Sequence, residues 1–426
     1  MSNVCILFHY PCPITKLPSY YDQLANELEQ SHTVLVVNLM KMDMIDENIV
    51  SKIVLFKPDL IITFNNAIYP SIYEKTDCKI LVIEADSYPH AFHYIDSMMT
   101  HRNKIYIGCP HENSRRRLRN IIHWVHDEQL IVFKNSTSFL NVDTAINHQD
   151  INISFIGSFP IITEQDNSIS RFLSHHRTNH TELRRIKTIL QKSIINIHDI
   201  TEDELISIQS NFDDLFRYIS YRQRTKVLES IADLGLVAFA QISGDTPYLS
   251  LLGDLIFSLH VVNEMLTAFD NKVIYDRSKV SVNVHYAHNL LIPELSDYSW
   301  RVCDILASQS CLVSTYCPAL NQDFSKWVNI PQFSNPSEAY DICKKLLADD
   351  HWRHDIIHAS QIAIIEGGFT FRDRVRELES LFNLVPNINK NESDYLFLSS
   401  SISVQNKSSS VFNRIKERLS VAHKSK

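Results

Sequence analysis

The first part of the chain alternates short apolar runs with amphipathic segments, and this alternation limits the possible folds more than any other feature. Apolar runs at Val4–His9, Thr33–Leu39 and Leu60–Phe64 have the length of strands and no polar face. Between them, Tyr20–Glu29 and Ile45–Phe56 carry apolar residues at helical spacing. Strands that are apolar on both sides and separated by helices are typical of a parallel sheet covered by helices on both faces.

The same alternation continues far enough to predict two domains. Three further apolar runs predict strands at Lys79–Glu84, Lys104–Gly108 and Leu130–Phe133. Together these segments predict a first α/β domain over residues 1–149, and the strand Ile151–Gly157 opens a second domain over residues 150–386. A chain of 426 residues is too long for one ordinary core and suits two.

The second domain contains a strand, a loop, a helix and a strand within Lys272–Pro318. Alternating polarity predicts a strand at Lys279–His285, helical spacing predicts a helix at Tyr298–Gln309, and an apolar run predicts a strand at Cys311–Thr315. This unit forms the ligand-binding crevice of doubly wound sheets, where ligands bind at the carboxyl ends of the strands.

The remaining segments of the second half are assigned more simply. Polar helical patterns predict a helical insertion over residues 169–234, followed by a strand at Leu236–Ile242 and a helix at Leu251–Thr267. The last helix, residues 371–384, begins after the N-cap residue Thr370. Two helices precede it. Asn335 is the N-cap of the first, and Gly367 and Gly368 end the second.

Composition excludes several classes of function. The hydrophobic fraction of 44% and charged fraction of 21% are ordinary for a globular protein, and the net charge of −8 argues against general nucleic-acid binding. The eight cysteines form no C-x-x-C pair, and the chain opens directly in a strand with no basic leader, so we expect reduced thiols and a cytoplasmic protein. No apolar run approaches the roughly 20 residues of a membrane-spanning helix.

Several catalytic motifs are also missing from the sequence. It contains no GxGxxG or GxxxxGK[ST] phosphate loop and no G-x-S-x-G nucleophile motif. The 20 histidines are scattered and form no zinc pattern with cysteine or glutamate, so we expect neither a metal nor a cofactor.

The segment CDILASQSCLV resembles the donor-sugar segment of glycosyltransferases with two Rossmann-like domains, the GT-B fold, which is commonly written E-A-x-A-x-G-x-P-V. The longer text SWRVCDILAS, before a strand and a Tyr-x-Pro, resembles the CgeB-like (spore-maturation type) branch, related to glycosyltransferase group 1. The downstream segments also follow the order of the family. They are LVSTYCPALNQDF, SNPSEAYDICKKLLADD and GGFTFRDRVRELESLF. The resemblance implies two Rossmann-like domains that face a cleft, with a final helix that can cross back to the first domain.

This resemblance also implies an activity: the metal-independent transfer of a sugar from a nucleotide-diphosphate sugar to a glycan, lipid-linked or protein acceptor. In the resembled family, a carboxylate at the start of the helix after the loop binds the ribose hydroxyls. The resemblance assigns that role to Asp304. The sequence departs from the family pattern here, because aspartate replaces the usual glutamate, Ser296 stands where a second carboxylate is usual, and Gln309 stands where a glycine is usual.

Other residues of the second domain are candidates for the donor phosphates. Arg301, Lys279 and Arg277 supply cations that can neutralise a diphosphate leaving group. Backbone N–H groups at the start of the helix can also bind phosphate. The residues that supply these groups are Tyr298, Ser299 and Trp300. Gly157 is the small residue at the end of the first strand of the second domain.

In the first domain, Asp86 and His90 follow the strand Lys79–Glu84, and His9 ends the first strand. Each is a candidate general base that would accept the proton of the acceptor hydroxyl. The basic run Arg115–Arg119 can hold an anionic acceptor or membrane phosphates, but a solvated helix face is the better explanation.

From residue 387 to 426 the composition changes to Asn, Ser and Lys, which predicts a polar linker followed by a short basic amphipathic helix at residues 411–423. That helix is either a peripheral membrane contact at the inner face of the membrane or a simple basic tail. The richness in Ile, Asn, Lys and Ser points to a bacterial enzyme of surface polysaccharide or glycoconjugate synthesis. Two alternatives remain at this point: a catalytically degenerate GT-B binding subunit, and a GT-B nucleotide-sugar epimerase.

Overall fold

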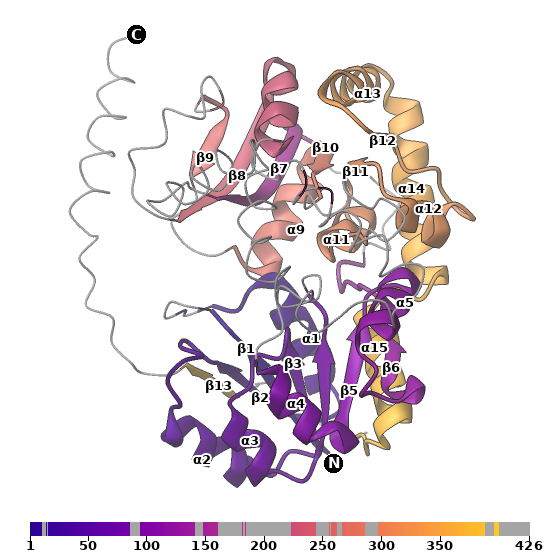
Figure 1. The fold of residues 1–426 in the computed structure, drawn as a ribbon. Coiled ribbons are helices and arrows are strands. Elements are labelled where there is room, and N and C mark those ends of the chain that lie inside the picture. The colour runs from indigo at the N-terminus through magenta and orange to yellow at the C-terminus, as the bar shows by residue number, and fades with distance from the viewer. Residues whose placement is uncertain are drawn as a thin grey trace, which may run out of the picture.

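The protein is described by a computed structural model. It covers residues 1–10, 14, 16–85, 94–140, 148–160, 181, 184, 223–243, 255, 257–261, 266–285, 297–387 and 396–399. The chain forms two α/β domains, and every strand pairing between neighbours in their two sheets is parallel (Figure 1).

The first domain contains a seven-stranded sheet in the order β13-β2-β1-β3-β4-β5-β6. Its strands are β1 Asn3–Phe8, β2 Thr33–Asn38, β3 Leu60–Phe64, β4 Lys79–Ile83, β5 Ile105–Cys109, β6 Leu130–Val132 and β13 Leu396–Ser399. Its helices are α1 Ser19–Glu29, α2 Glu47–Phe56, α3 Pro70–Lys75, α4 Ile95–Thr100 and α5 Glu112–Ile121. The six strands predicted for this domain are confirmed to within one residue at each end.

Helices cover both faces of this sheet, as strands without a polar face require. Along β1, Cys5 and Leu7 point into a core with α2, α3, α4 and α5, whereas Val4, Ile6 and Phe8 point into a core on the other face. That second core contains α1 and, from the far end of the sequence, α15 (Phe371–Phe382).

The second domain contains a six-stranded sheet in the order β12-β11-β10-β7-β8-β9. Its strands are β7 Ile151–Pro160, β8 Leu236–Ser243, β9 Leu259–Val261, β10 Ser278–Asn283, β11 Cys311–Thr315 and β12 Gln332–Phe333. Its helices are α9 Ala268–Asp276, α11 Arg301–Ala307, α12 Pro318–Phe324, α13 Pro336–Ala348 and α14 Asp350–Glu366, and residues 223–230 are also helical. The predicted strand, loop, helix and strand of the Lys272–Pro318 stretch correspond to β10, α11 and β11.

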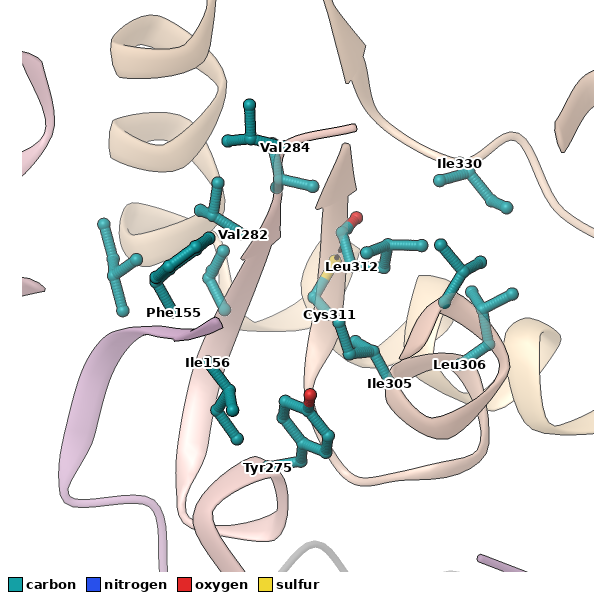
Figure 2. Packing of buried hydrophobic residues seen from close by; sticks show 14 of the residues in the cluster. Phe155, Ile156, Tyr275, Val282, Val284, Ile305, Leu306, Cys311, Leu312 and Ile330 are labelled. Carbon is teal, nitrogen blue, oxygen red and sulfur yellow. Dashed lines mark hydrogen bonds between the residues drawn. The ribbon is translucent and has the colours of Figure 1, made fainter. Parts of the chain in front are cut away.

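Apolar packing fixes α11 against its sheet. Figure 2 shows Cys311 of β11 beside Ile305 of α11, with Tyr275 of α9 below them and Val282 farther away on β10. All four side chains are buried. Because α11 is only seven residues long, its position depends on this packing rather than on its own helical stability.

The end of the chain returns to the first domain. Phe371, Val375 and Leu378 of α15 are buried in the core beneath β1, and β13 pairs in parallel with β2. The linker predicted from residue 387 is therefore wrong for Leu396–Ser399, an apolar run whose backbone groups find partners on the edge of the first sheet. The basic tail at 411–423 lies outside the described residues.

Two other predictions concern helices of the second domain. The helix expected at Leu251–Thr267 is wrong for Leu259–Val261, which forms strand β9 and pairs with Ala238–Ala240 of β8. An available sheet edge outweighs a helical pattern in such a short apolar segment. The predicted helical insertion lies mostly outside the described residues.

Within the part of the chain that the structure describes, no helix combines the length and the apolar character needed to cross a membrane.

The position of α15 gives a stability prediction. Phe371 is completely buried, so Phe371→Ala should lower the free energy of unfolding by about 3–5 kcal/mol through lost contacts and a cavity. The control is Leu381→Ala on the same helix, where the side chain is 41% exposed and the loss should stay below about 1 kcal/mol. Denaturant unfolding measures the free energy of unfolding of both variants. A loss for Phe371→Ala as small as that for Leu381→Ala would show that α15 is not part of the core.

Candidate functional site

Each sheet has a point where the strand order reverses. In the second sheet β7 lies between β8 and β10, and in the first sheet β1 lies between β2 and β3. Connections from such a central strand leave to opposite sides, which opens space beyond the carboxyl ends of the strands. The residues that follow β10 and β1 are therefore the first places to look for a site.

Four polar side chains gather at the carboxyl end of β10 and of its neighbour β11. The Asn283 amide lies 3.1 Å from the Ser314 hydroxyl, which lies 3.0 Å from Nε2 of His285. The backbone N–H of His285 donates to the Thr315 hydroxyl at 3.1 Å. All four residues are buried, yet among the described residues Oδ1 of Asn283 has no hydrogen-bond partner. This arrangement is a polar cluster at a place where a structural core would be apolar.

Two arginines lie beside this cluster. Arg224 donates a hydrogen bond to the carbonyl of Val284, between Asn283 and His285, at 3.5 Å. Arg301, the first residue of α11, is close enough for its charge to act on both the His285 ring and the Tyr275 hydroxyl. Burial, together with the charge of Arg301, lowers the pKa of His285 to about 3. His285 is therefore neutral at physiological pH and can only exchange hydrogen bonds, while Arg301 carries the positive charge.

An aromatic contact joins the two domains next to α11. The Trp300 ring lies 3.6 Å from the Tyr20 ring, 5.9 Å from Tyr21 and 6.0 Å from Phe64, measured between ring centroids. Phe64 is the last residue of β3, so the carboxyl end of the first sheet contacts the segment that leads into α11. The two candidate regions thus lie on the two sides of one domain junction.

Asp304 lies at the same junction and is held from the first domain. Its Oδ1 accepts a hydrogen bond from Nε2 of Gln23 at 3.1 Å and another from the Thr137 hydroxyl at 2.7 Å. Burial raises the pKa of Asp304 to about 6, although the bonds from Thr137 and Gln23 and the charge of Arg301 lower it. The predicted ribose-binding carboxylate is therefore ionised at neutral pH but protonates in mild acid.

A second, charged contact joins the domains through α5. Arg117 pairs with Glu84, which follows β4, and lies 3.8 Å from Asp297 of the second domain. Nε2 of His111 lies 3.4 Å from Asp323, whose other oxygen accepts a hydrogen bond from the Tyr298 hydroxyl. Burial lowers the pKa of His111, but the hydrogen bond to Asp323 and the nearby carboxylates outweigh this, so the pKa is raised. This network fixes the segment that precedes α11.

The structure brings together only some of the predicted phosphate-binding residues. Tyr298, Ser299 and Trp300 lie beside Arg301. The Tyr298 hydroxyl, however, donates to Asp323, and its carbonyl accepts from the Asn135 amide of the first domain. Arg277 and Lys279 lie at the amino end of β10, the opposite edge of the sheet, and Arg277 forms an ion pair with Asp150.

At Gly157, a Cβ would lie 2.6 Å from the Phe155 ring, so this glycine makes room for a core side chain. Strand direction therefore leaves Arg277 and Lys279 out of the candidate site, whereas Gly157 lies in the carboxyl half of β7, the strand beside β10.

In the first domain, His9 directly follows β1, the strand at which the strand order reverses. Its Nδ1 lies 2.6 Å from the carbonyl oxygen of Leu39, so Nδ1 carries the proton of the neutral ring and Nε2 is the proton acceptor. Asn65 and Asn66, after β3, adopt left-handed backbone angles with φ of 51° and 57°. Asp86 and His90 lie outside the described residues.

The basic run on α5 is only partly buried. Arg117 is buried at the domain junction, Arg115 pairs with Glu112 at 2.9 Å, and Arg119 pairs with Asp127. The side chains of Arg116 and Arg119 stay 72% and 57% exposed, so this part of the run is a solvated helix face while Arg117 has a structural role.

Sequence reasoning missed six residues of this site: Asn283, His285, Ser314, Thr315, Gln23 and Thr137. A signal existed for the first four, because polar residues at the ends of predicted buried strands fall where doubly wound sheets bind ligands. Gln23 and Thr137 lie on a helix and a loop of the other domain, and no local pattern connects them with Asp304.

Comparison with known proteins identifies the fold. No protein-family model and no curated protein matches the chain. Among solved structures, a glycosyltransferase from Rickettsia africae ESF-5 is 11% identical with a TM-score of 0.50, over 89% of this chain and 98% of that one. Anabaena Alr3699/HepE, solved in complex with UDP-glucose, is 10% identical with a TM-score of 0.49, over 90% and 100%.

TarM is 12% identical with a TM-score of 0.44, and the match covers 79% of this chain but only 57% of TarM. At such identities the likeness concerns the fold alone. The two Rossmann-like domains with parallel sheets have the GT-B fold, which confirms the predicted fold class.

The raised pKa of Asp304 predicts a pH-dependent stability. Since its folded-state pKa of about 6 exceeds the ordinary value of 3.8, stability from this group is present below pH 3.8 and is lost as pH rises through 6. Asp304→Asn removes this loss. The stability of the variant relative to the wild type should therefore rise by about 2–3 kcal/mol between pH 4 and pH 7 in denaturant unfolding. A difference that does not change with pH would contradict the buried, ionisable state of Asp304.

Proposed function

We propose that this chain is a glycosyltransferase that moves a sugar from a nucleotide-diphosphate sugar to an acceptor hydroxyl. The observation that carries the proposal is the buried polar cluster of Asn283, His285 and Ser314 with Arg301 at the carboxyl end of β10. It lies at the strand reversal of a GT-B fold, where doubly wound sheets bind ligands. The donor-sugar resemblance in the sequence falls on α11 and β11, which border this cluster.

The proposed donor site divides the nucleotide among residues with different chemistry. Arg301 neutralises the diphosphate, which carries increasing charge as the bond to the sugar breaks. Asp304 accepts hydrogen bonds from the ribose hydroxyls in its ionised form. Among the described residues Oδ1 of Asn283 has no hydrogen-bond partner, and this acceptor suits a hydroxyl or amide donor of a sugar or base rather than a phosphate.

The transfer breaks the bond between the anomeric carbon of the sugar and the phosphate oxygen, and it forms a bond from that carbon to the acceptor oxygen. The acceptor proton needs a base on the first-domain side. His9 suits this role because its Nδ1 proton is held by the carbonyl of Leu39 and leaves Nε2 as the acceptor. Asp86 and His90 remain candidates for the same role.

The finer features are also proposals. The acceptor is a glycan, a lipid-linked saccharide or a protein, and the pathway is bacterial surface polysaccharide or glycoconjugate synthesis, as the CgeB-like resemblance suggests. The reaction needs no metal, because Arg301 supplies the positive charge at the diphosphate. The protein acts in the cytoplasm, with residues 411–423 as a possible contact to the inner face of the membrane.

Nucleotide binding gives the first test. A thermal-shift screen against UDP, GDP, TDP, CMP and ADP should show a rise in melting temperature with one base, because ligand binding stabilises the folded state. The rise should be the same with and without Mg²⁺ or Mn²⁺, and a rise that requires the metal would overturn metal independence. No response to any nucleotide would instead favour the degenerate binding subunit. In a separate product analysis, a changed nucleotide sugar formed without any acceptor would favour the epimerase.

The position of Arg301 gives a sharper prediction. Arg301→Met should weaken binding of the responding nucleotide by about 10- to 100-fold, because a charge-assisted contact to the diphosphate is lost. Arg277→Met makes the same change of charge at the amino end of β10, away from the candidate site, and it should leave the affinity within about twofold. Isothermal titration calorimetry measures both, and equal effects would place the nucleotide elsewhere.

The proposed base gives a kinetic prediction. His9→Gln should lower kcat by about 10²- to 10⁴-fold while nucleotide affinity stays unchanged, since His9 belongs to the acceptor side. Steady-state kinetics with a competent acceptor tests this, and unchanged kcat would move the role to Asp86 or His90.

A further inference from the structure

We propose that Gln23 and Thr137 of the first domain position the Asp304 carboxylate for the ribose of the donor, so that donor recognition by the second domain requires the first. The inference deepens the proposed function and rests on it. Neither residue belongs to the second domain, and neither needs to touch the donor. Both act through Asp304, so they are positioning residues.

The orientation of the Gln23 amide is fixed by its surroundings. Its Oε1 accepts a hydrogen bond from the backbone N–H of Ser138 at 2.6 Å, and a backbone N–H can only donate. Nε2 must therefore face the other way, where it lies 3.1 Å from Oδ1 of Asp304 and 3.0 Å from the Ser19 hydroxyl. The side chain is 4% exposed, so it has little freedom to turn. Gln23 can only present a donor to Asp304.

The orientation of the Thr137 hydroxyl is also fixed by its neighbours. Its oxygen accepts from the backbone N–H of Phe139 at 3.1 Å, and its single proton points to the nearest strong acceptor, Oδ1 of Asp304 at 2.7 Å. Two donors from the first domain thus converge on one carboxylate oxygen. This leaves Oδ2 to accept a hydrogen bond from a ribose hydroxyl in the fixed plane of the carboxylate.

The backbone of Thr137 is tied to the segment where the chain crosses between domains. Its N–H donates to the carbonyl of Phe369 at 3.1 Å, and its carbonyl accepts from the N–H of Phe371 at 3.2 Å. Gln23 lies on α1, one turn from Tyr20, which packs against Trp300. Both positioning residues are therefore anchored to elements that set how the domains meet, so a change in that arrangement moves the carboxylate.

Both hydrogen bonds also favour the ionised form of Asp304. Burial favours the neutral form, and the bonds from Thr137 and Gln23 and the charge of Arg301 oppose it. The other ionisable groups close to this carboxylate, from α1, α9 and α11, are Tyr20, Tyr275 and Cys303. These three are neutral across the physiological range, because burial raises each of their pKa values. Loss of either bond should therefore raise the pKa of Asp304.

The test is the pH dependence of donor affinity for Thr137→Val and Gln23→Leu. The probe is the nucleotide-diphosphate glucose of the base that stabilises the protein, because its phosphodiester groups do not titrate between pH 5 and 9. In the wild type, affinity should fall about twofold from pH 8 to pH 6, as Asp304 becomes half protonated. In each variant the midpoint should move up by about one pH unit, which makes that fall about tenfold.

Three controls separate positioning from a structural effect. Thr137→Ser keeps the hydroxyl and should restore the wild-type pH profile. Asp304→Asn should bind weakly with no acid limb. Thr76→Val removes another buried threonine hydroxyl of the first domain, one that donates to the carbonyl of Ile72, and it should leave the profile unchanged.

The outcomes separate this inference from the function on which it rests. A wild type that binds the donor, with variants whose midpoint does not move, would overturn the positioning role alone. A wild type that binds none of the nucleotide sugars would overturn the proposed function, and the inference with it. Gln23→Leu tests the inference independently should Thr137→Val fail to fold.

Discussion

The buried carboxylate of Asp304 is the group on which the domain junction depends. It lies on a helix of the second domain, yet both of its hydrogen-bond donors, Gln23 and Thr137, come from the first. A carboxylate is costly to bury without such donors, and its pKa of about 6 shows that the cost is only partly offset. A buried, partly compensated charge at a contact between two domains is typical of a functional site rather than of a structural core.

The surrounding contacts fix this group in place. Trp300 packs into the aromatic residues around Tyr20, and the network of Arg117, Asp297 and Asp323 holds the segment that leads into α11. As a result, the carboxyl end of the first sheet lies against the residues that follow β10. The GT-B fold thereby brings a cation and a polar cluster of one domain to the same junction as His9 of the other.

Much of the fold follows from the sequence because its signals are local. Apolar strands such as β3 and β11 have the predicted bounds, and the donor-sugar resemblance directs attention to α11. The sequence does not show strand direction relative to a site, so it groups Arg277 and Lys279, at the amino end of β10, with Arg301 of α11. Tertiary contacts also decide β9, β13 and the partners of Asp304, which no local pattern reveals.

The central claim is that a nucleotide binds at the carboxyl end of β10, beside α11. Hydrogen–deuterium exchange with and without the stabilising nucleotide tests it most directly, because it maps protection along the backbone without any substitution. The account predicts slower exchange at residues 283–285 and 299–304 and little change at the amino end of β10. Protection confined to the first domain, or at the edge of the sheet that carries Arg277, would contradict it.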